Sequence, residues 1–472
     1  EAKIADARRV LRSAVLECSE RGLYHASKWA AEQIVGLARP TLNPSDTPTE
    51  PVFKIPQRSS RATASSALSP PLTKELDDAE EDSILLARSY FQTREFQRAA
   101  YAVRHGRSLK AVWWRLYSKY MAGEKSKDEN VASHEEEAPA VNNELHAIAE
   151  ELKKMPEKDN DPFLQYLYGI VTSAQDQKHV AEEALISSVT AFPANWSAWV
   201  HLAGLITNQF DLYRIYPKLP DHFMRQFFLV SVTNNRCYQV EQLPDDIRGL
   251  KGLFPGSTYL KAQFALARYN QREFEEAEPC FSELMKNDPY AVDHLDKYSN
   301  LLYVEKKSAK LFNLAQHAYK IDRYRHETCC ILGNYFSLKG EHQMAVTYFQ
   351  RAIKLNRNCY EAYTLLGHEY IEMSNTDLAI EAYRRATQLN AGEFRAWYGL
   401  GQCYLILKGH QMALFYFEKA VALKPYDTRI WITLGQVYKL DGRIEEAIAC
   451  FKRDLVINGA HALISLASIY AE

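Results

Sequence analysis

The chain has 472 residues, of which 47% are hydrophobic and 25% are charged, as in an ordinary globular protein. Its 57 basic and 59 acidic side chains give a net charge of −2, which excludes a uniformly basic nucleic-acid-binding protein. No apolar run reaches the roughly 18 residues of a membrane span, and the chain does not open with a signal-peptide pattern. We therefore expect neither nucleic acid nor a membrane among its partners.

Residues 1–38 are predicted to form a helical hairpin that breaks near Gly22 and ends before Pro40. Residues 39–80 follow with seven prolines and many Ser and Thr, a composition typical of a disordered linker. Thr47-Pro48 and Ser69-Pro70 in this linker match proline-directed phosphorylation sites; an unmodified linker explains them equally well.

Residues 81–257 are predicted to be a degenerate array of helical hairpins. Tyr168-Gly169, Ala181 and Leu185 keep the spacing of a pattern that is clearer downstream, whereas residues 224–256 are helical but poorly patterned. The charged stretch 122–143 interrupts the array, and we interpret it as a solvated loop inside a hairpin rather than an acidic docking site.

Residues 258–472 carry a repeat of 34 residues. Leu-Gly pairs recur at this period, and twelve residues after each Gly comes Ala, followed four residues later by an aromatic residue. The four glycines are Gly333, Gly367, Gly401 and Gly435. This is the tetratricopeptide (TPR) pattern, in which small residues let helices A and B of a hairpin approach closely and aromatic residues are expected to fill the space between one hairpin and the next. We predict an all-α TPR solenoid, a right-handed superhelix of antiparallel hairpins.

The sequence contains no catalytic motif: it lacks the serine-hydrolase elbow, the phosphate-binding loops and the zinc-protease helix. Its eight cysteines include no C-x-x-C pair, and its histidines do not cluster at metal-ligand spacing. We therefore expect no enzyme activity, no cofactor and no metal, and reduced cysteines in a nuclear or cytosolic protein.

The inner faces of the A helices are the predicted binding surface. If the Gly of each repeat is position 8, then positions 2, 5 and 9 share one helical face and are not needed for the small–large packing. Position 9 is polar in successive repeats, and its side chains could bond the backbone of an extended peptide. These residues are Asn300, Asn334, His368, Gln402 and Gln436, and Tyr398 lies at position 5 of its repeat.

The charges on this face indicate the kind of peptide. A clamp for a C-terminal carboxylate would need cations beside Asn300 and Asn334, yet the sequence offers Asp296 and Glu361. Acidic groups beside amides favour a basic ligand, most naturally an Arg side chain.

Three segments of the C-terminal array carry a more specific resemblance: ETCCILGNYFSLKGEHQMAVTYFQRAIKLN (327–356), LLGHEYIEMSNTDLAIEAYRRA (365–386) and FRAWYGLGQCYLILKGHQMALFYFEKA (394–420). They closely resemble subunit 8 of the anaphase-promoting complex/cyclosome, the Cdc23-type TPR subunits. Weaker similarity, such as RGLYHASKW at 21–29, extends over essentially the whole chain.

This resemblance implies a non-catalytic scaffold subunit of a RING-type E3 ubiquitin ligase that acts in mitosis, in nucleus and cytoplasm. It implies a homodimer formed through the N-terminal TPRs, contacts with other subunits of the complex, and a C-terminal TPR groove that binds an Arg-bearing coactivator motif, the C-box. By this resemblance, the family's groove contacts fall on Asn334 and Glu369. A sister TPR scaffold of the same complex, a co-chaperone and the targeting arm of a glycosyltransferase remain as alternatives.

Overall fold

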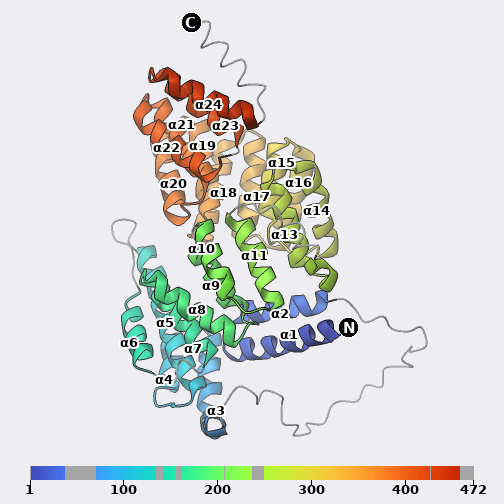
Figure 1. Cartoon of the computed structure of the whole chain (residues 1–472), viewed down its shortest axis with the longest axis vertical. Helices are drawn as coiled ribbons and strands as arrows, with labels where there is room; N and C mark the ends of the chain where they lie inside the picture. Colours follow the sequence, from blue (N-terminus) through green and yellow to red (C-terminus); the bar gives the residue numbers. More distant parts are fainter. Residues whose placement is uncertain are drawn as a thin grey trace, which may run out of the picture. The chain divides into compact units, whose positions relative to one another are not determined.

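In a computed structural model of the chain, the residues that can be described are 2–37, 71–133, 142–155, 161–206, 208–236, 249–425 and 427–457. Over these residues the secondary structure consists of helices and turns, which confirms the predicted all-α class (Figure 1). The chain divides into two compact units, Glu1–Phe264 and Ala265–Glu472. The sequence had placed a boundary between residues 257 and 258 instead.

The N-terminal unit begins with the predicted hairpin, helices α1 (Ala2–Glu20) and α2 (Tyr24–Gly36). Gly22 joins them with a φ of 73°, a left-handed conformation that glycine adopts without strain. The remaining helices of the unit are α3 (Pro71–Gln92), α4 (Phe96–Ala102), α5 (Leu109–Ser133), α6 (Glu144–Lys154), α7 (Pro162–Ala174), α8 (Lys178–Ala191), α9 (Trp196–Leu205), α10 (Gln209–Ile215), the short 3₁₀ helix η3 (Tyr216–Lys218) and α11 (Phe223–Arg236).

Aromatic side chains fix the first hairpin to the rest of this unit. The indole nitrogen of Trp113, on α5, donates to the backbone oxygen of Arg21 at 3.1 Å. Trp29 on α2 stacks on Trp196 of α9, with ring centroids 4.4 Å apart. Because these contacts join residues far apart in sequence, α1 and α2 belong to the core of the unit rather than to a separate N-terminal domain.

Two predicted irregular segments are partly helical. Helix α3 begins at Pro71, so the last ten residues of the predicted linker belong to it. Helix α5 runs to Ser133, so the first half of the predicted charged loop 122–143 is helical, with Lys125–Glu129 and Lys127–Glu124 ion pairs along it. The rest of the linker, with Thr47 and Ser69, and residues 134–141 lie outside the described residues.

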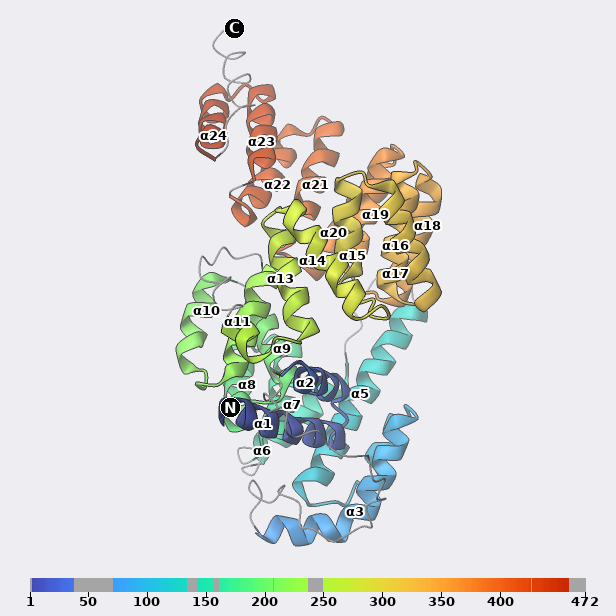
Figure 2. The ribbon, with the colours of Figure 1, turned by 90° about the vertical axis from the view of Figure 1, so that its right-hand side faces the viewer.

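The C-terminal unit is a row of helical hairpins (Figure 2). Helix α13 (Thr258–Asn270) crosses the division between the units, and it is followed by α14 (Phe274–Asn287), α15 (Leu295–Val304), α16 (Ser308–Ile321), α17 (His326–Leu338), α18 (His342–Leu355), α19 (Tyr360–Glu372), α20 (Thr376–Leu389), α21 (Phe394–Ile406), α22 (His410–Leu423), α23 (Thr428–Leu440) and α24 (Ile444–Ile457). Odd-numbered helices from α13 onward are the A helices of the predicted repeats.

The repeated glycines let A and B helices pack as predicted. A Cβ atom on Gly333 would lie 2.4 Å from the ring of Phe349, and one on Gly401 would lie 2.7 Å from the ring of Phe417. The aromatic residue therefore fills the space inside its own hairpin, against the glycine of the same repeat, instead of the space between hairpins. Substitution of either glycine would overpack this contact.

Tyr383 occupies a tighter place, between two A helices. Cβ atoms built on Gly367 of α19 and on Gly399 of α21 would both overlap its ring, at 2.6 and 2.4 Å. The second glycine, two residues before the repeat glycine Gly401, has no counterpart in the neighbouring repeats. It makes room for the tyrosine ring where the other repeats have a larger residue.

Seven cysteines lie in described segments, where they are free and all but Cys280 are buried. Cys237 lies outside the described residues.

Candidate functional site

The predicted site residues lie on four successive A helices of the C-terminal unit. Asn300 is on α15, Asn334 on α17, His368 and Glu369 on α19, and Tyr398 and Gln402 on α21. We call positions 2, 5 and 9 of these helices, with the residues directly beside them, the inner face.

Asn300 and Asn334 are bonded to one another rather than projecting freely. The side-chain nitrogen of Asn334 donates to Oδ1 of Asn300 at 2.7 Å and to the hydroxyl of Ser299 at 2.8 Å. Both asparagines are buried, Asn334 with 2% of its surface exposed. The position 9 amides thus stabilise the contact between neighbouring A helices, which differs from the expectation that packing does not use them.

Glu369 is a buried carboxylate with two partners. It accepts a hydrogen bond of 2.6 Å from the hydroxyl of Ser337, on α17, and lies 2.9 Å from Nδ1 of His342. The hydroxyl of Tyr303, on α15, lies 3.2 Å from the same serine oxygen. Polar groups of three consecutive A helices are therefore linked around this carboxylate, and Asn334 lies three residues before Ser337 on α17.

His368 and Tyr398 are engaged in the packing of hairpins. The hydroxyl of Tyr383 and Nδ1 of His368 share a hydrogen bond of 2.7 Å, and burial lowers the pKa of the histidine to about 4, so the ring is neutral. The hydroxyl of Tyr398 lies 3.2 Å from that of Thr433, and its ring packs edge-on against Phe417. Gln402, on the same helix as Tyr398, is half-buried.

A charged cluster on the inner face was missed by the sequence interpretation. Lys297 forms an ion pair with Glu361, and its ammonium lies 3.7 Å from Asp296. These side chains come from α15 and α19, which are separated along the chain by the hairpin of α17 and α18. The acids that the sequence assigned to a basic ligand therefore already have a cation in this structure.

A second ion pair extends this charged region. Nε of Arg395 lies 2.6 Å from Glu393, at the start of α21. Burial raises the pKa of Glu393, but the neighbouring guanidinium outweighs that effect and lowers it overall. For Lys297, burial is the largest single influence and lowers the pKa, but Asp296 together with other neighbours such as Tyr360 outweighs it and raises the pKa overall, so the ammonium stays charged.

The beginning of the unit also contacts its far end. A guanidinium nitrogen of Arg272, in the turn after α13, lies 3.5 Å from Asp427, which caps the N-terminus of α23. Asp427 also accepts bonds from the backbone and side chain of Arg429. This link spans five repeats, so the A helices curve enough to bring distant turns together.

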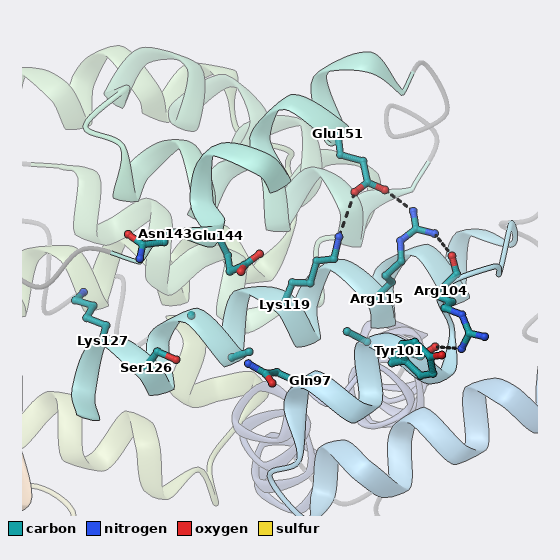
Figure 3. Close-up of a pocket in the computed structure, with 13 residues that line it drawn as sticks. Gln97, Tyr101, Arg104, Arg115, Lys119, Ser126, Lys127, Asn143, Glu144 and Glu151 are labelled. Atoms are coloured by element: carbon teal, nitrogen blue, oxygen red, sulfur yellow. Dashed lines mark hydrogen bonds and ion pairs between the residues drawn. The ribbon is translucent and has the colours of Figure 1, made fainter. Parts of the chain in front are cut away.

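The N-terminal unit has a cavity of about 730 Å³ between α4, α5 and α6, lined by both apolar and charged side chains (Figure 3). Arg115 and Lys119 on its wall are paired with Glu151, and the guanidinium of Arg104 stacks on the ring of Tyr101 at 3.8 Å. The lining as a whole contains four basic and two acidic side chains: Arg104, Arg115, Lys119, Lys127, Glu144 and Glu151. Its charge suits an acidic rather than a basic ligand.

Within the described segments, no helix is both long and apolar enough to span a bilayer. In the same segments, no three His, Cys, Asp or Glu side chains gather as a metal site would require.

Models of known protein families match most of the sequence. The model of the family described as "Anaphase promoting complex subunit 8 / Cdc23" matches residues 6–265, more than half of the sequence. Models of the tetratricopeptide repeat match residues 326–359, 364–428 and 428–453, which confirms the predicted repeat type.

Individual relatives agree with the family model. The chain is 40% identical to anaphase-promoting complex subunit 8 of Arabidopsis thaliana over 362 residues, which cover 73% of this chain and 62% of that protein. It is 35% identical to subunit 8 of Dictyostelium discoideum, over 72% of this chain and 64% of that one. It is 36% identical to the human cell division cycle protein 23 homolog, over 64% of this chain and 47% of that protein. The chain thus spans less than two thirds of the length of these relatives.

A solved structure supports the fold. The crystal structure of the APC/C hetero-tetramer Cut9-Hcn1 contains a chain that matches with a TM-score of 0.59 and 18% identity, over 82% of this chain and 75% of that one. The family match over more than half of the sequence, the TPR models over the C-terminal hairpins and this common architecture agree with each other, and the chain belongs to the anaphase-promoting complex subunit 8/Cdc23 family.

Proposed function

We propose that the chain is a non-catalytic scaffold subunit of the anaphase-promoting complex/cyclosome, a RING-type E3 ubiquitin ligase that controls mitotic progression. Membership of the subunit 8/Cdc23 family is the observation that carries this proposal. The scaffold contacts other subunits of the complex, forms a homodimer through its N-terminal TPRs and works in nucleus and cytoplasm.

The inner face of the C-terminal unit is the proposed site for the coactivator's C-box. Two separate acidic places on this face attract guanidinium groups: the buried carboxylate of Glu369 and, eight residues earlier on α19, Glu361 with the neighbouring Asp296. Asn334, on the neighbouring A helix α17, is the amide that the family resemblance assigns to this site; in this structure it bonds Asn300 and Ser299. The sequence and the geometry both favour an Arg-containing peptide over a C-terminal carboxylate.

Calorimetric titration of the whole chain with a synthetic C-box peptide tests the site. Glu369→Gln keeps the shape and the Ser337 bond but removes the charge, and we expect it to weaken binding about tenfold. Gln388→Ala, on the exposed side of α20, is the matched control and should bind as the wild type does. Equal affinity of the Glu369→Gln variant and the wild type would contradict the assignment.

Light scattering on the same sample tests the homodimer. A dimer whose peptide affinity depends on the peptide's Arg supports the proposal. A monomer that ignores this Arg and binds an acidic C-terminal tail instead would indicate a co-chaperone.

A further inference from the structure

The ion pair between Lys297 and Glu361 crosses the inner face. Lys297 leaves α15 and reaches the first turn of α19, passing the intervening helix α17. The side chains of Lys297, Asp296 and Glu361 are only 20%, 14% and 14% exposed. An ammonium group is therefore held, largely out of water, by two carboxylates at the place where the sequence predicts a ligand cation.

The charge balance of this region depends on Lys297. Asp296, Glu361 and Glu393 contribute three carboxylates, and Lys297 and Arg395 contribute the two cations that face them. Arg395 is paired with Glu393, two residues earlier in the chain. Without Lys297, the carboxylates of Asp296 and Glu361 would lose the cation that lies beside both of them.

We propose that Lys297 is an internal competitor of the bound peptide: its ammonium occupies the two carboxylates that the ligand's guanidinium takes on binding. This inference rests on the proposed function of the inner face. Binding then exchanges an intramolecular ion pair for an intermolecular one, so part of the interaction energy is spent on releasing Lys297.

The exchange favours Arg over Lys in the ligand. A guanidinium group has five donors in a plane and can bond two carboxylates at once, whereas an ammonium group is a compact point charge. A ligand lysine would replace Lys297 by an identical group and gain little. The internal lysine thus makes the inner face selective for arginine and disfavours other basic peptides.

The test measures the affinity of the full chain for a fluorescein-labelled C-box peptide by anisotropy. Lys297→Met removes the competitor, and we expect the peptide to bind about fivefold more tightly. Lys297→Arg strengthens the competitor while keeping its charge, and it should weaken binding. If Lys297 only stabilised the fold, the order of the peptide affinities would be reversed. Met would then destabilise the inner face and weaken binding, whereas Arg would keep the ion pair and preserve binding.

Two controls separate the possible outcomes. Lys310→Met removes a lysine that pairs with Glu278 between α14 and α16, and it should leave the affinity unchanged. A peptide with citrulline in place of Arg should bind weakly to every variant. Equal or weaker binding by a folded Lys297→Met variant, or tighter binding by Lys297→Arg, overturns the competitor role. If neither the wild type nor any variant distinguishes Arg from citrulline, the proposed function of the face itself fails.

Discussion

Replacing Gly399 with alanine would place a methyl group against the ring of Tyr383. The added carbon would lie 2.4 Å from Cζ of the tyrosine and 2.7 Å from two further ring atoms. The ring cannot move away, because Gly367 of α19 also lies against it and its hydroxyl is hydrogen-bonded to His368. The substitution therefore tests whether residue 399 must be glycine to leave room for the ring of Tyr383.

Two opposing terms set the expected magnitude. Alanine stabilises a helix interior by about 1 kcal/mol relative to glycine. Overpacking of a core contact destabilises by about 1–3 kcal/mol. We therefore expect a net loss of up to about 2 kcal/mol in the free energy of unfolding, localised to α19–α21.

A double-mutant cycle isolates the ring contact. In a Tyr383→Leu background the methyl group has room, so Gly399→Ala should stabilise by about 0.5–1 kcal/mol. In a Tyr383→Phe background the ring remains, and the loss should persist. Urea unfolding gives the energies, and hydrogen exchange of α19–α21 peptides shows where they act. The same loss in the Leu and wild-type backgrounds would refute the reasoning.

Three further predictions concern other contacts. Gly401→Leu should overpack Phe417 and destabilise by about 1–3 kcal/mol in thermal unfolding, and an unchanged melting temperature would contradict the repeat register. Gly22→Ala should destabilise the N-terminal unit by about 1–2 kcal/mol, because φ is 73° and the new Cβ would lie 3.0 Å from Trp114; urea titration measures the loss. The pKa of His368 is about 4 in the folded chain and 6.5 in the unfolded chain. Between these pH values the unfolded chain binds one more proton than the folded chain, so the free energy of unfolding falls as the pH drops from 6.5 to 4. Denaturation at several pH values should show this extra slope in the wild type and not in His368→Gln.

The repeat architecture could be predicted because its determinants are local. Gly333 and Phe349, or Gly401 and Phe417, are sixteen residues apart, and their contact is fixed by one hairpin. The helix over residues 122–133 could also have been predicted from the sequence, since Lys125 and Glu129 have the four-residue spacing of a helix ion pair. The interpretation as a loop gave too much weight to charge alone.

The partners on the inner face could not be predicted in the same way. Whether Lys297 reaches Glu361 depends on how strongly successive hairpins curve, and that angle is the sum of many side-chain contacts. The spacing of position 9 placed Asn300 and Asn334 on one face correctly, but it could not show that they bond each other. Helical periodicity gives the direction of a side chain, not the distance to the next repeat.

The link between Arg272 and Asp427 changes how the C-terminal unit should unfold. A linear repeat protein, whose repeats contact only their neighbours, frays from its ends, and its stability is a sum of local terms. Here the turn after α13 and the start of α23 hold one another, and Lys297 joins α15 to α19. Fraying of the last hairpin therefore also breaks a contact of the first, so the two ends of the row are weakly coupled in unfolding.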